Sequence, residues 1–267
     1  MDAAALSEVA VQIAREAADL SKTVRDEAVT EGVDTKSSET DVVTAGDRAV
    51  ERLVRDRLAE LRPGESVLGE EEGGEVALDG LRWVVDPIDG TVNYLYGFPF
   101  YAVSLAAQLD GESIAGAVVE PVSGRVWSAA KGHGGFLDGE PLRVSGTERL
   151  ELSLIATGFS YSVQRRTAQA RVAGELLGKV RDIRRAGAAS LDLCAVAAGW
   201  LDGTYEVGLN RWDWAAGALV ATEAGADLRL PEKGAADGLG DGMVVCSAPG
   251  ITGQLADALR EADAGAV

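Results

Sequence analysis

The chain has 267 residues, 46% of them hydrophobic, so it can bury a sizeable core without disulfides. Its 43 acidic residues outnumber 25 Lys and Arg, and the net charge of −18 disfavours binding to nucleic acid or to an anionic membrane. No stretch approaches the roughly 18 apolar residues of a membrane span, and the N-terminus lacks the pattern of a secretory signal. We therefore expect a soluble protein with no nucleic-acid or membrane partner. Both cysteines stand in apolar stretches, as buried free thiols do, so we also expect a cytoplasmic location.

The N-terminal part of the chain predicts two helices. Residues 3–28 carry apolar side chains at helical spacing. A polar segment, Thr35–Thr40, then leads to Asp47, after which apolar residues from Val50 to Leu61 repeat the helical spacing. The second helix ends at Pro63-Gly64. We expect both helices to precede the first strand.

The pattern changes twice in the rest of the chain. Between Ser66 and Val144, short apolar runs are separated by hairpin signals, which predict an antiparallel sheet: Asp110-Gly111, Ser123-Gly124 and Asp138-Gly139. Later, strands at 152–158, 181–185, 204–207 and 243–248 alternate with helices at 164–178, 190–200, 213–224 and 250–262. The predicted fold class is α+β, with an antiparallel N-terminal lobe (residues 1–145) packed on a C-terminal α/β lobe (residues 146–267).

The most informative segment is 82–94, where an apolar strand ends in Asp-Pro-Ile-Asp-Gly-Thr. Gly90 allows a close backbone approach that a side chain would obstruct. The turn could aim the carboxylates of Asp86 and Asp89 and the Ile88 carbonyl at one point. All three are hard oxygen donors of the kind that magnesium prefers. An ordinary turn capped by aspartates is the alternative interpretation.

Two further acidic elements lower the weight of that alternative. Residues 67–72 form an apolar strand that runs into carboxylates, so Glu70 can begin at the sheet edge and point into a site. Asp213 stands at the start of an apolar helix, where capping is its other possible role. Carboxylates gathered without a cation would repel, at about 4 kcal/mol per pair at 4 Å and an effective dielectric near 20. A bound divalent metal removes that objection.

Three segments together resemble the inositol monophosphatase family, within the lithium-sensitive, magnesium-dependent phosphatases. They are GEE at Gly69–Glu71, DPIDGTVNY at Asp86–Tyr94 and WDWAAG at Trp212–Gly217, in the family's order and approximate spacing. The resemblance covers essentially the whole chain. It implies a layered αβαβα sandwich of the sugar-phosphatase type, and a homodimer, which the sequence itself does not show.

The resemblance also implies roles for individual residues. Two or three magnesium ions would be held by Glu70, Asp86, the Ile88 carbonyl, Asp89 and Asp213. Asp47 and Thr91 are similar to the pair that orients and activates the attacking water, with Glu70 assisting. The backbone amides of Gly90 and Thr91 would hold the phosphate, and Asp213 would also border the substrate.

The substrate end of the site is implied by two further matches. Ala189, in the segment 187–190, is similar to the alanine that lies against the substrate ring. Glu206 is similar to the acid that receives substrate hydroxyls. Lys36 matches a lysine of the family, although a solvated loop lysine fits the sequence equally well. Arg184, Arg185 and Arg211 lie near the substrate segment in the sequence.

The implied reaction is hydrolysis of a small phosphorylated polyol by activated water, without a phosphoenzyme. Inositol 1-phosphate is favoured because the chain length, the motif forms and Glu206 match that branch. Histidinol phosphate, fructose 1,6-bisphosphate, NADP and 3′-phosphoadenosine 5′-phosphate stay open, because the metal core is shared. A metal-binding regulatory protein without catalysis is the alternative from another class. The sole histidine, His133, lies in a predicted turn and gives little support to histidine chemistry.

Overall fold

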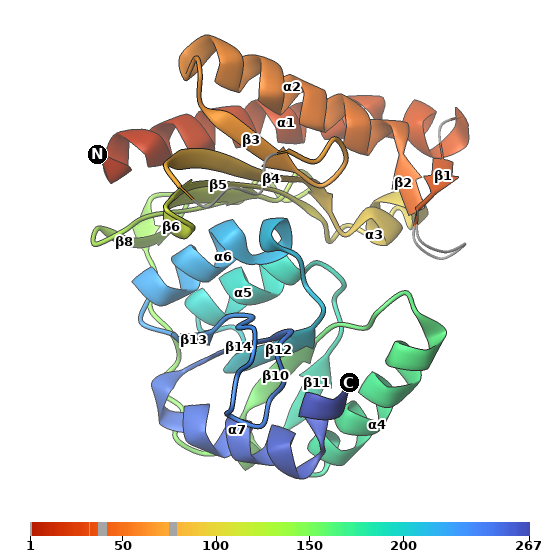
Figure 1. Cartoon of the computed structure of the whole chain (residues 1–267), viewed down its shortest axis with the longest axis vertical. Coiled ribbons are helices and arrows are strands. Elements are labelled where there is room, and N and C mark those ends of the chain that lie inside the picture. The colour runs from red at the N-terminus through yellow and green to blue at the C-terminus, as the bar shows by residue number, and fades with distance from the viewer. Residues whose placement is uncertain (1, 32, 37–41, 75–78) are drawn as a thin grey trace.

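The computed structural model describes the chain except for residues 1, 32, 37–41 and 75–78. Its helices and sheets form five layers, with helices outside and between two sheets (Figure 1). The outer layer on one side holds α1 (Ala3–Glu31) and α2 (Ala45–Leu61), the middle layer α5 (Ala189–Ala197) and α6 (Arg211–Glu223), and the far side α4 (Val163–Leu177) and α7 (Thr252–Glu261). This is the predicted layered αβαβα sandwich.

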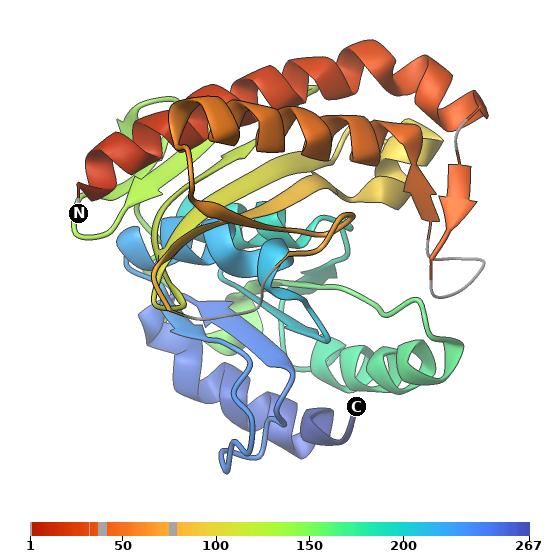
Figure 2. The ribbon, with the colours of Figure 1, turned by 45° about the horizontal axis from the view of Figure 1, so that its top comes forward.

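Helices α1 and α2 lie side by side across one face of the larger sheet (Figure 2). Their inward residues, such as Ile13, Val50 and Val54, are fully buried against strand residues such as Trp83 and Val85. Burying a side chain of this size stabilises the fold by about 1.5–3 kcal/mol. The stripe of apolar residues read from the sequence is therefore the stripe that packs on the sheet.

The larger sheet has seven strands in sequence order. They are β3 (Ser66–Gly69), β4 (Leu81–Asp89), β5 (Ala102–Leu109), β6 (Glu112–Val119), β7 (Val126–Ala130), β8 (Gly134–Leu137) and β9 (Glu140–Pro141). The prediction of a wholly antiparallel sheet is wrong at one edge, since β3 runs parallel to β4 with Gly69 opposite Val85. Parallel pairing brings the carboxyl ends of both strands to the same edge.

The predicted hairpin turns connect successive strands of this sheet. Asp110 and Gly111 join β5 to β6 with φ angles of 51° and 86°. Asp138 and Gly139 join β8 to β9 with φ angles of 51° and 87°. Positive φ at both central residues is the backbone of a type I′ turn, which matches the twist of the two strands and favours Asp-Gly.

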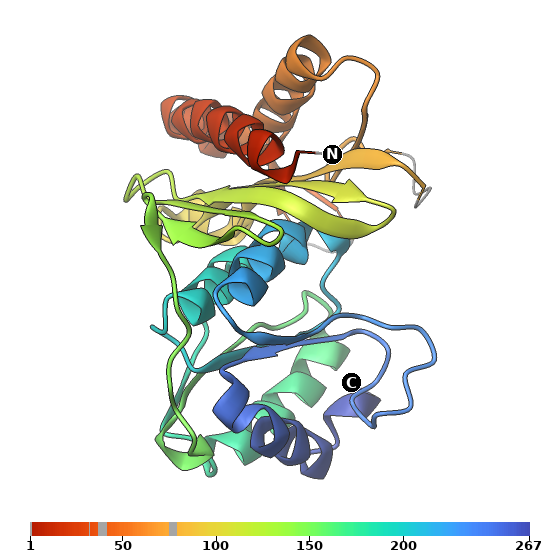
Figure 3. The same ribbon diagram turned by 90° about the vertical axis from the view of Figure 1, so that its left-hand side faces the viewer.

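The smaller sheet has the order β11-β10-β12-β14-β13. Its strands are β10 (Leu154–Thr157), β11 (Asp182–Arg184), β12 (Gly203–Val207), β13 (Asp227–Arg229) and β14 (Met243–Ser247). Strand β10 pairs in parallel with β11 and β12, whereas β14 pairs antiparallel with β12 and β13. The three-residue β13 was not predicted, whereas β11, of the same length, was. Figure 3 shows α5 and α6 between the two sheets.

Helices α5 and α6 are apolar on most sides because each contacts a sheet and the other helix. Their shared core includes Leu191, Leu193, Cys194, Ala215 and Leu219. Gly217 faces the Ser190 carbonyl so closely that a Cβ there would lie 2.8 Å from that oxygen. The close approach of the two helices fixes the position of their N-terminal ends, where Ala189 and Asp213 stand.

The remaining elements are short. Strands β1 (Val33–Thr35) and β2 (Val42–Thr44) pair between α1 and α2, so the expectation that both helices precede any strand is wrong. The predicted polar segment Thr35–Thr40 lies partly outside the described residues. Helix α3 (Thr91–Tyr96) follows β4, and 3₁₀ turns occupy Leu150–Leu152, Pro249–Ile251 and Ala264–Ala266. Among the described helices, none is both long and apolar enough to cross a membrane. The division into lobes at residues 145 and 146 stays a prediction.

Candidate active site

A pocket of about 790 Å³ lies where the ends of β3 and β4 meet α5, α6 and β12. Every site residue predicted from the sequence lines it except Asp47, namely Glu70, Asp86, Ile88, Asp89, Gly90, Thr91, Ala189, Glu206 and Asp213. Lys36 lines it as well. Residues far apart in the sequence meet here because the larger sheet, the middle helices and the smaller sheet all reach one edge of the molecule.

The turn after β4 carries an irregularity that aims its side chains into the pocket. Asp86 pairs with Ser104 and Asp89 with Ala102, so β4 has one more residue than β5 between these pairs. This is a β-bulge, which re-aims side chains at a strand end. The Ile88 amide donates to Asp86 Oδ1 at 3.1 Å. Gly90 has φ 95°, and a Cβ there would lie 3.1 Å from the Gly187 carbonyl oxygen, so a larger residue would strain the turn.

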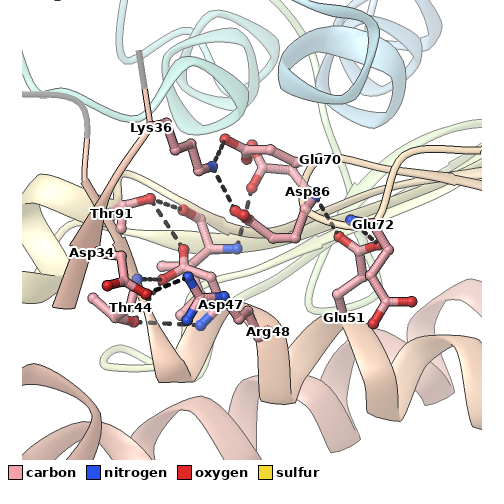
Figure 4. Close-up of polar contacts among 12 residues, drawn as sticks. Asp34, Lys36, Thr44, Asp47, Arg48, Glu51, Glu70, Glu72, Asp86 and Thr91 are labelled. Atoms are coloured by element: carbon pink, nitrogen blue, oxygen red, sulfur yellow. Dashed lines mark hydrogen bonds and ion pairs between the residues drawn. The ribbon is translucent and has the colours of Figure 1, made fainter. Parts of the chain in front are cut away.

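Asp47 lies behind Thr91, in the first turn of α2 (Figure 4). Its Oδ2 accepts hydrogen bonds from the amide and hydroxyl of Thr44 at 2.8 and 2.6 Å, which caps the helix. Its Oδ1 accepts from the Thr91 hydroxyl at 3.1 Å. Both side chains are buried, with Asp47 fully inaccessible. One oxygen therefore holds the helix start, and the other faces the pocket through Thr91.

Glu70 directly follows β3 and lies beside a cation that the chain itself supplies. Lys36 Nζ lies 2.8 Å from Glu70 Oε1 and 2.6 Å from Glu71 Oε1 (Figure 4). Burial opposes the charge of Lys36, but the two carboxylates outweigh it and raise its pKa. Lys36 is thus a pocket residue rather than a solvated loop lysine.

Asp89 and Asp213 are each held by a helix N-terminus. The amides of Ala189 and Ser190 donate to Asp89 at 3.1 and 2.7 Å, and the Ser190 hydroxyl donates at 2.5 Å. The Asn210 amide donates to Asp213 Oδ2 at 2.5 Å, so this aspartate does cap its helix while it lines the pocket. Capping and pocket lining were alternatives in the sequence, and Asp213 does both.

Four aspartates of the site have raised pKa values: Asp47, Asp86, Asp89 and Asp213. Burial is the main cause throughout, and the charges of neighbouring carboxylates add to it. The pKa rises to about 6 for Asp47 and Asp89 and lies well above the ordinary value for Asp86 and Asp213. The ionised forms therefore repel one another and lack enough positive charge nearby.

The donor chemistry of these residues fits a hard divalent cation. Four carboxylates and a carbonyl supply only oxygen ligands, and a cation among them would offset both burial and mutual repulsion. Glu70 and Asp89 are at present directed to Lys36 and Ser190. Over the described part of the chain, no group of three or more His, Cys, Asp or Glu side chains is arranged to hold an ion. Residues 70, 86, 88, 89 and 213 are the ones that would hold it.

The substrate end of the pocket holds two further acids, Glu206 and Asp192. Glu206, the next-to-last residue of β12, lies against Gly158, where a Cβ would overlap its carboxylate. Burial first, and then the charge of Asp89, raises the pKa of Glu206 to about 7, and Arg185 opposes this rise. Asp192, on α5, lines the same pocket and is buried, and burial and Glu206 raise its pKa.

Of the three arginines near the substrate segment, only Arg185 lines the pocket. Arg184 pairs with Asp182 at 2.6 Å. Arg211 turns to Gln108 Oε1 and the Gly111 carbonyl, at 2.9 and 3.0 Å. His133 lies in the turn between β7 and β8 and is exposed, away from the pocket.

Sequence reasoning missed three residues that the structure brings to the site. Ser190 was seen only as part of a segment, although it donates twice to Asp89. Asp192 was passed over as one more residue in an apolar helix. Glu51 was not singled out in the sequence, yet it is fully buried beneath the loop that carries Glu70. Its spacing of four residues from Asp47 placed both on one helix face and was the available signal.

The fold and site define a layered α+β protein with an acidic, metal-compatible pocket. The model of the inositol monophosphatase family matches residues 2–264. The chain belongs to this family, and it is therefore an enzyme of a phosphatase family.

Individual relatives agree with this assignment. The chain is 54% identical to an inositol-1-monophosphatase of Mycobacterium leprae over 234 residues, covering 84% of this chain and 80% of the relative. It is 42% identical to the Nus factor SuhB of Pseudomonas aeruginosa over 192 residues, covering 69% and 70%. The solved structure of Mycobacterium tuberculosis SuhB superposes with a TM-score of 0.83 at 44% identity, covering 98% of both chains.

Proposed function

We propose that this protein is a magnesium-dependent phosphomonoesterase that hydrolyses a small polyol phosphate, with inositol 1-phosphate as the favoured substrate. One observation carries the proposal: buried carboxylates with raised pKa values line the pocket beside Thr91, whose hydroxyl donates to Asp47 behind it. The family is generally metal-dependent, and its relative in M. leprae is an inositol-1-monophosphatase. Two or three ions per site are part of the proposal.

The chain's own groups would manage the proton of the attacking water. A water that donates to Thr91 Oγ would be oriented by it, while Thr91 donates to Asp47 Oδ1 at 3.1 Å. Because the pKa of Asp47 is about 6, its carboxylate is mostly ionised at neutral pH and can accept a proton. Bound magnesium would activate water and stabilise the charge that develops on the leaving oxygen. Amides of Gly90 and Thr91 would hold the phosphate.

Substrate selection would fall to the other end of the pocket. Glu206 would accept hydrogen bonds from polyol hydroxyls, and Ala189 would lie against the ring. Both line the pocket together with the metal-compatible acids. Glu206 is already partly buried against Gly158, which lowers the further cost of desolvating its carboxylate when a substrate binds.

The test is phosphate release from inositol 1-phosphate and a panel of esters, with magnesium, with EDTA and with added lithium. We expect hydrolysis that needs magnesium and stops with EDTA, and inhibition by lithium. Undiminished activity after chelation would refute the metal mechanism, whereas lithium insensitivity would question only the subfamily. No hydrolysis of any ester would favour a regulatory protein without catalysis.

A second candidate substrate class carries another anionic group, as fructose 1,6-bisphosphate, NADP and 3′-phosphoadenosine 5′-phosphate do. Arg165 and Arg185 line the pocket, and neither forms an ion pair with another described residue. Their neighbours Arg166 and Arg184 lie outside the pocket lining and serve as matched controls. We expect Arg165→Gln and Arg185→Gln to weaken hydrolysis of fructose 1,6-bisphosphate more than of inositol 1-phosphate if the second class is physiological. Equal effects on both esters would favour the monophosphate.

A cytoplasmic location, expected from the sequence, and a homodimeric state, implied by the family resemblance, stay part of this proposal. Sedimentation velocity at micromolar protein concentration measures the oligomeric state directly. A single species with the mass of one chain would contradict the dimer. Histidinol phosphate belongs in the same ester panel, because its site would share the catalytic core.

A further inference from the structure

Helix α2 contacts the site at two points that are one turn apart. Asp47, in its first turn, reaches Thr91, and Glu51, four residues later, reaches the loop after β3. Residues four apart lie on the same face of a helix. Figure 4 shows both side chains above the same helix, with Glu70 and Asp86 on the pocket side. One rigid element therefore touches the water-activating pair and the loop that carries Glu70.

Glu51 is fully buried and has no role in the proposed reaction. Its Oε2 accepts from the Glu71 amide at 2.8 Å, and its Oε1 accepts from the Glu72 amide at 3.1 Å. These amides follow Glu70 directly in the chain. A carboxylate that accepts two successive backbone amides holds that turn in one orientation.

The charge of Glu51 is compensated by Arg55, one turn further along α2. Arg55 Nη2 lies 2.7 Å from Glu51 Oε1 and donates to the Gly73 carbonyl at 2.6 Å. Gly73 in turn accepts from the Gly69 amide at 3.0 Å. The loop 69–73 is thus closed on itself and bound to α2 through a buried carboxylate and guanidinium.

Gly69 shows how tightly the carboxylate fits. A Cβ on Gly69 would overlap the Glu51 carboxylate, although Gly69 has no positive φ that would itself demand glycine. The glycine that begins the GEE segment is therefore required by Glu51. This contact gives a second, independent way to disturb the loop.

We propose that Glu51 is a positioning residue that sets the location of Glu70 relative to Asp47, and so the affinity of the site for magnesium. The proposal rests on the proposed function. Groups that orient metal ligands from behind change metal affinity by about 10- to 100-fold when they are removed. Glu51 acts through the backbone of residues 71 and 72 and touches neither substrate nor water.

The experiment compares Glu51→Gln and Gly69→Ala with wild type and with Glu60→Gln. Glu60 lies on the same helix and is exposed, and among the described residues it pairs only with Arg57, so its substitution changes the same charge away from the loop. Two quantities are measured on each folded, full-length protein. The first is amide hydrogen exchange of residues 69–73 without metal, and the second is magnesium affinity by calorimetry and by the magnesium dependence of turnover.

We expect faster exchange in the loop for both test variants and a magnesium affinity weaker by about 10-fold or more. The Glu60→Gln control should match wild type. A role confined to overall stability would lower the active fraction but leave the half-saturating magnesium concentration unchanged, and that result would overturn the proposal. Unchanged loop exchange would overturn it too. If wild type itself binds no magnesium, the proposed function fails, while the exchange comparison still decides whether Glu51 holds the loop.

Discussion

Two groups of carboxylates in this protein experience opposite environments. In the pocket, Asp86, Asp89 and Asp213 are gathered with few cations, and burial raises their pKa values. In the loop after β13, Asp237 receives two hydrogen bonds from Arg229, at 2.5 and 3.1 Å, and its pKa falls to about 2. A paired acid at the surface serves the fold, whereas unpaired acids gathered in a cleft are typical of a functional site.

The gathered carboxylates of the pocket also lower the stability of the folded protein. A buried carboxylate with a raised pKa favours its protonated form in the folded state, so the ionised site destabilises the metal-free protein at neutral pH. Such a cost persists in a protein when function requires it. Substitutions of the pocket carboxylates are therefore expected to gain stability and lose activity, whereas substitutions of Asp237 should lose stability and leave activity unchanged.

The largest effect is expected for Asp213→Asn and Asp89→Asn. Each removes a proposed ligand charge with little change in volume, and we expect turnover of inositol 1-phosphate to fall by about 10²-fold or more, close to abolition. Asp213 accepts one amide hydrogen bond, from Asn210. The metal-free Asp213→Asn protein should therefore keep or gain thermal stability. Near-normal activity at saturating magnesium would contradict the ligand assignment.

Water activation gives the next largest effect. Thr91→Ala removes the hydroxyl that joins Asp47 to the nucleophile, and we expect kcat to fall by about 10²- to 10⁴-fold. Thr91→Ser should retain much of the activity, because it keeps the hydroxyl. The Thr91→Ala and Asp47→Asn double variant should lose no more than either single variant, since the two act as a unit. Small losses in both single variants would exclude the relay.

Glu206→Gln should separate substrate recognition from catalysis. The amide keeps the shape but weakens charge-assisted acceptance by about 1.5–3 kcal/mol. We expect kcat/KM for inositol 1-phosphate to fall by about 10- to 100-fold, with p-nitrophenyl phosphate barely affected and the magnesium dependence unchanged. Equal losses on both esters would place Glu206 in the catalytic or structural part of the site. No loss on either would favour another substrate.

The same variant tests the stability cost. The pKa of Glu206 is about 7 in the fold, and its ordinary value is about 4.3. Below about pH 4, Glu206 is protonated in both the folded and the unfolded state and does not lower stability. As the pH rises to about 7, the unfolded state ionises first, so the free energy of unfolding falls. As the pH rises from about 4 to 7, the melting temperature of metal-free Glu206→Gln should therefore rise relative to that of the metal-free wild type. A constant difference from pH 4 to pH 8 would show that Glu206 has no raised pKa.

Much of the fold was open to prediction because its signals are local. Helical stripes and Asp-Gly turns depend on neighbouring residues, so α1, α2 and the hairpins β5–β6 and β8–β9 were foreseen. The parallel pairing of β3 with β4 was not foreseen, because it requires both strands to begin at the same edge of the sheet, and no local signal shows this. Strands β1, β2 and β13 are only three residues each and show no periodicity.

The site divides in the same way. Motif residues such as Asp86 and Asp89 stand out in the chain and do line one pocket. Ser190 and Asp192 reach the site through tertiary contacts and have nothing distinctive around them in the sequence. Glu51 shares a helix face with Asp47, but its contact with the site forms only because the loop 69–73 folds back onto α2. No local sequence pattern predicts that contact. Supporting residues are therefore the part of a site that needs coordinates.

The smallest expected effect belongs to the opposite kind of carboxylate. Asp237→Asn should leave phosphatase activity unchanged, because Asp237 lies outside the pocket lining. Arg229 lowers the pKa of Asp237 to about 2, so the ion pair stabilises the fold above about pH 4 and this contribution is lost as the pH falls toward 2. The Asp237 side chain is 37% exposed, and solvent screening limits the loss at pH 7 to less than about 1 kcal/mol. Chemical denaturation of both proteins at pH 7 and at pH 3 measures the difference, which should shrink at the lower pH. A difference that grew on acidification would assign Asp237 to the same class as Glu206, and the contrast between the two environments would fail.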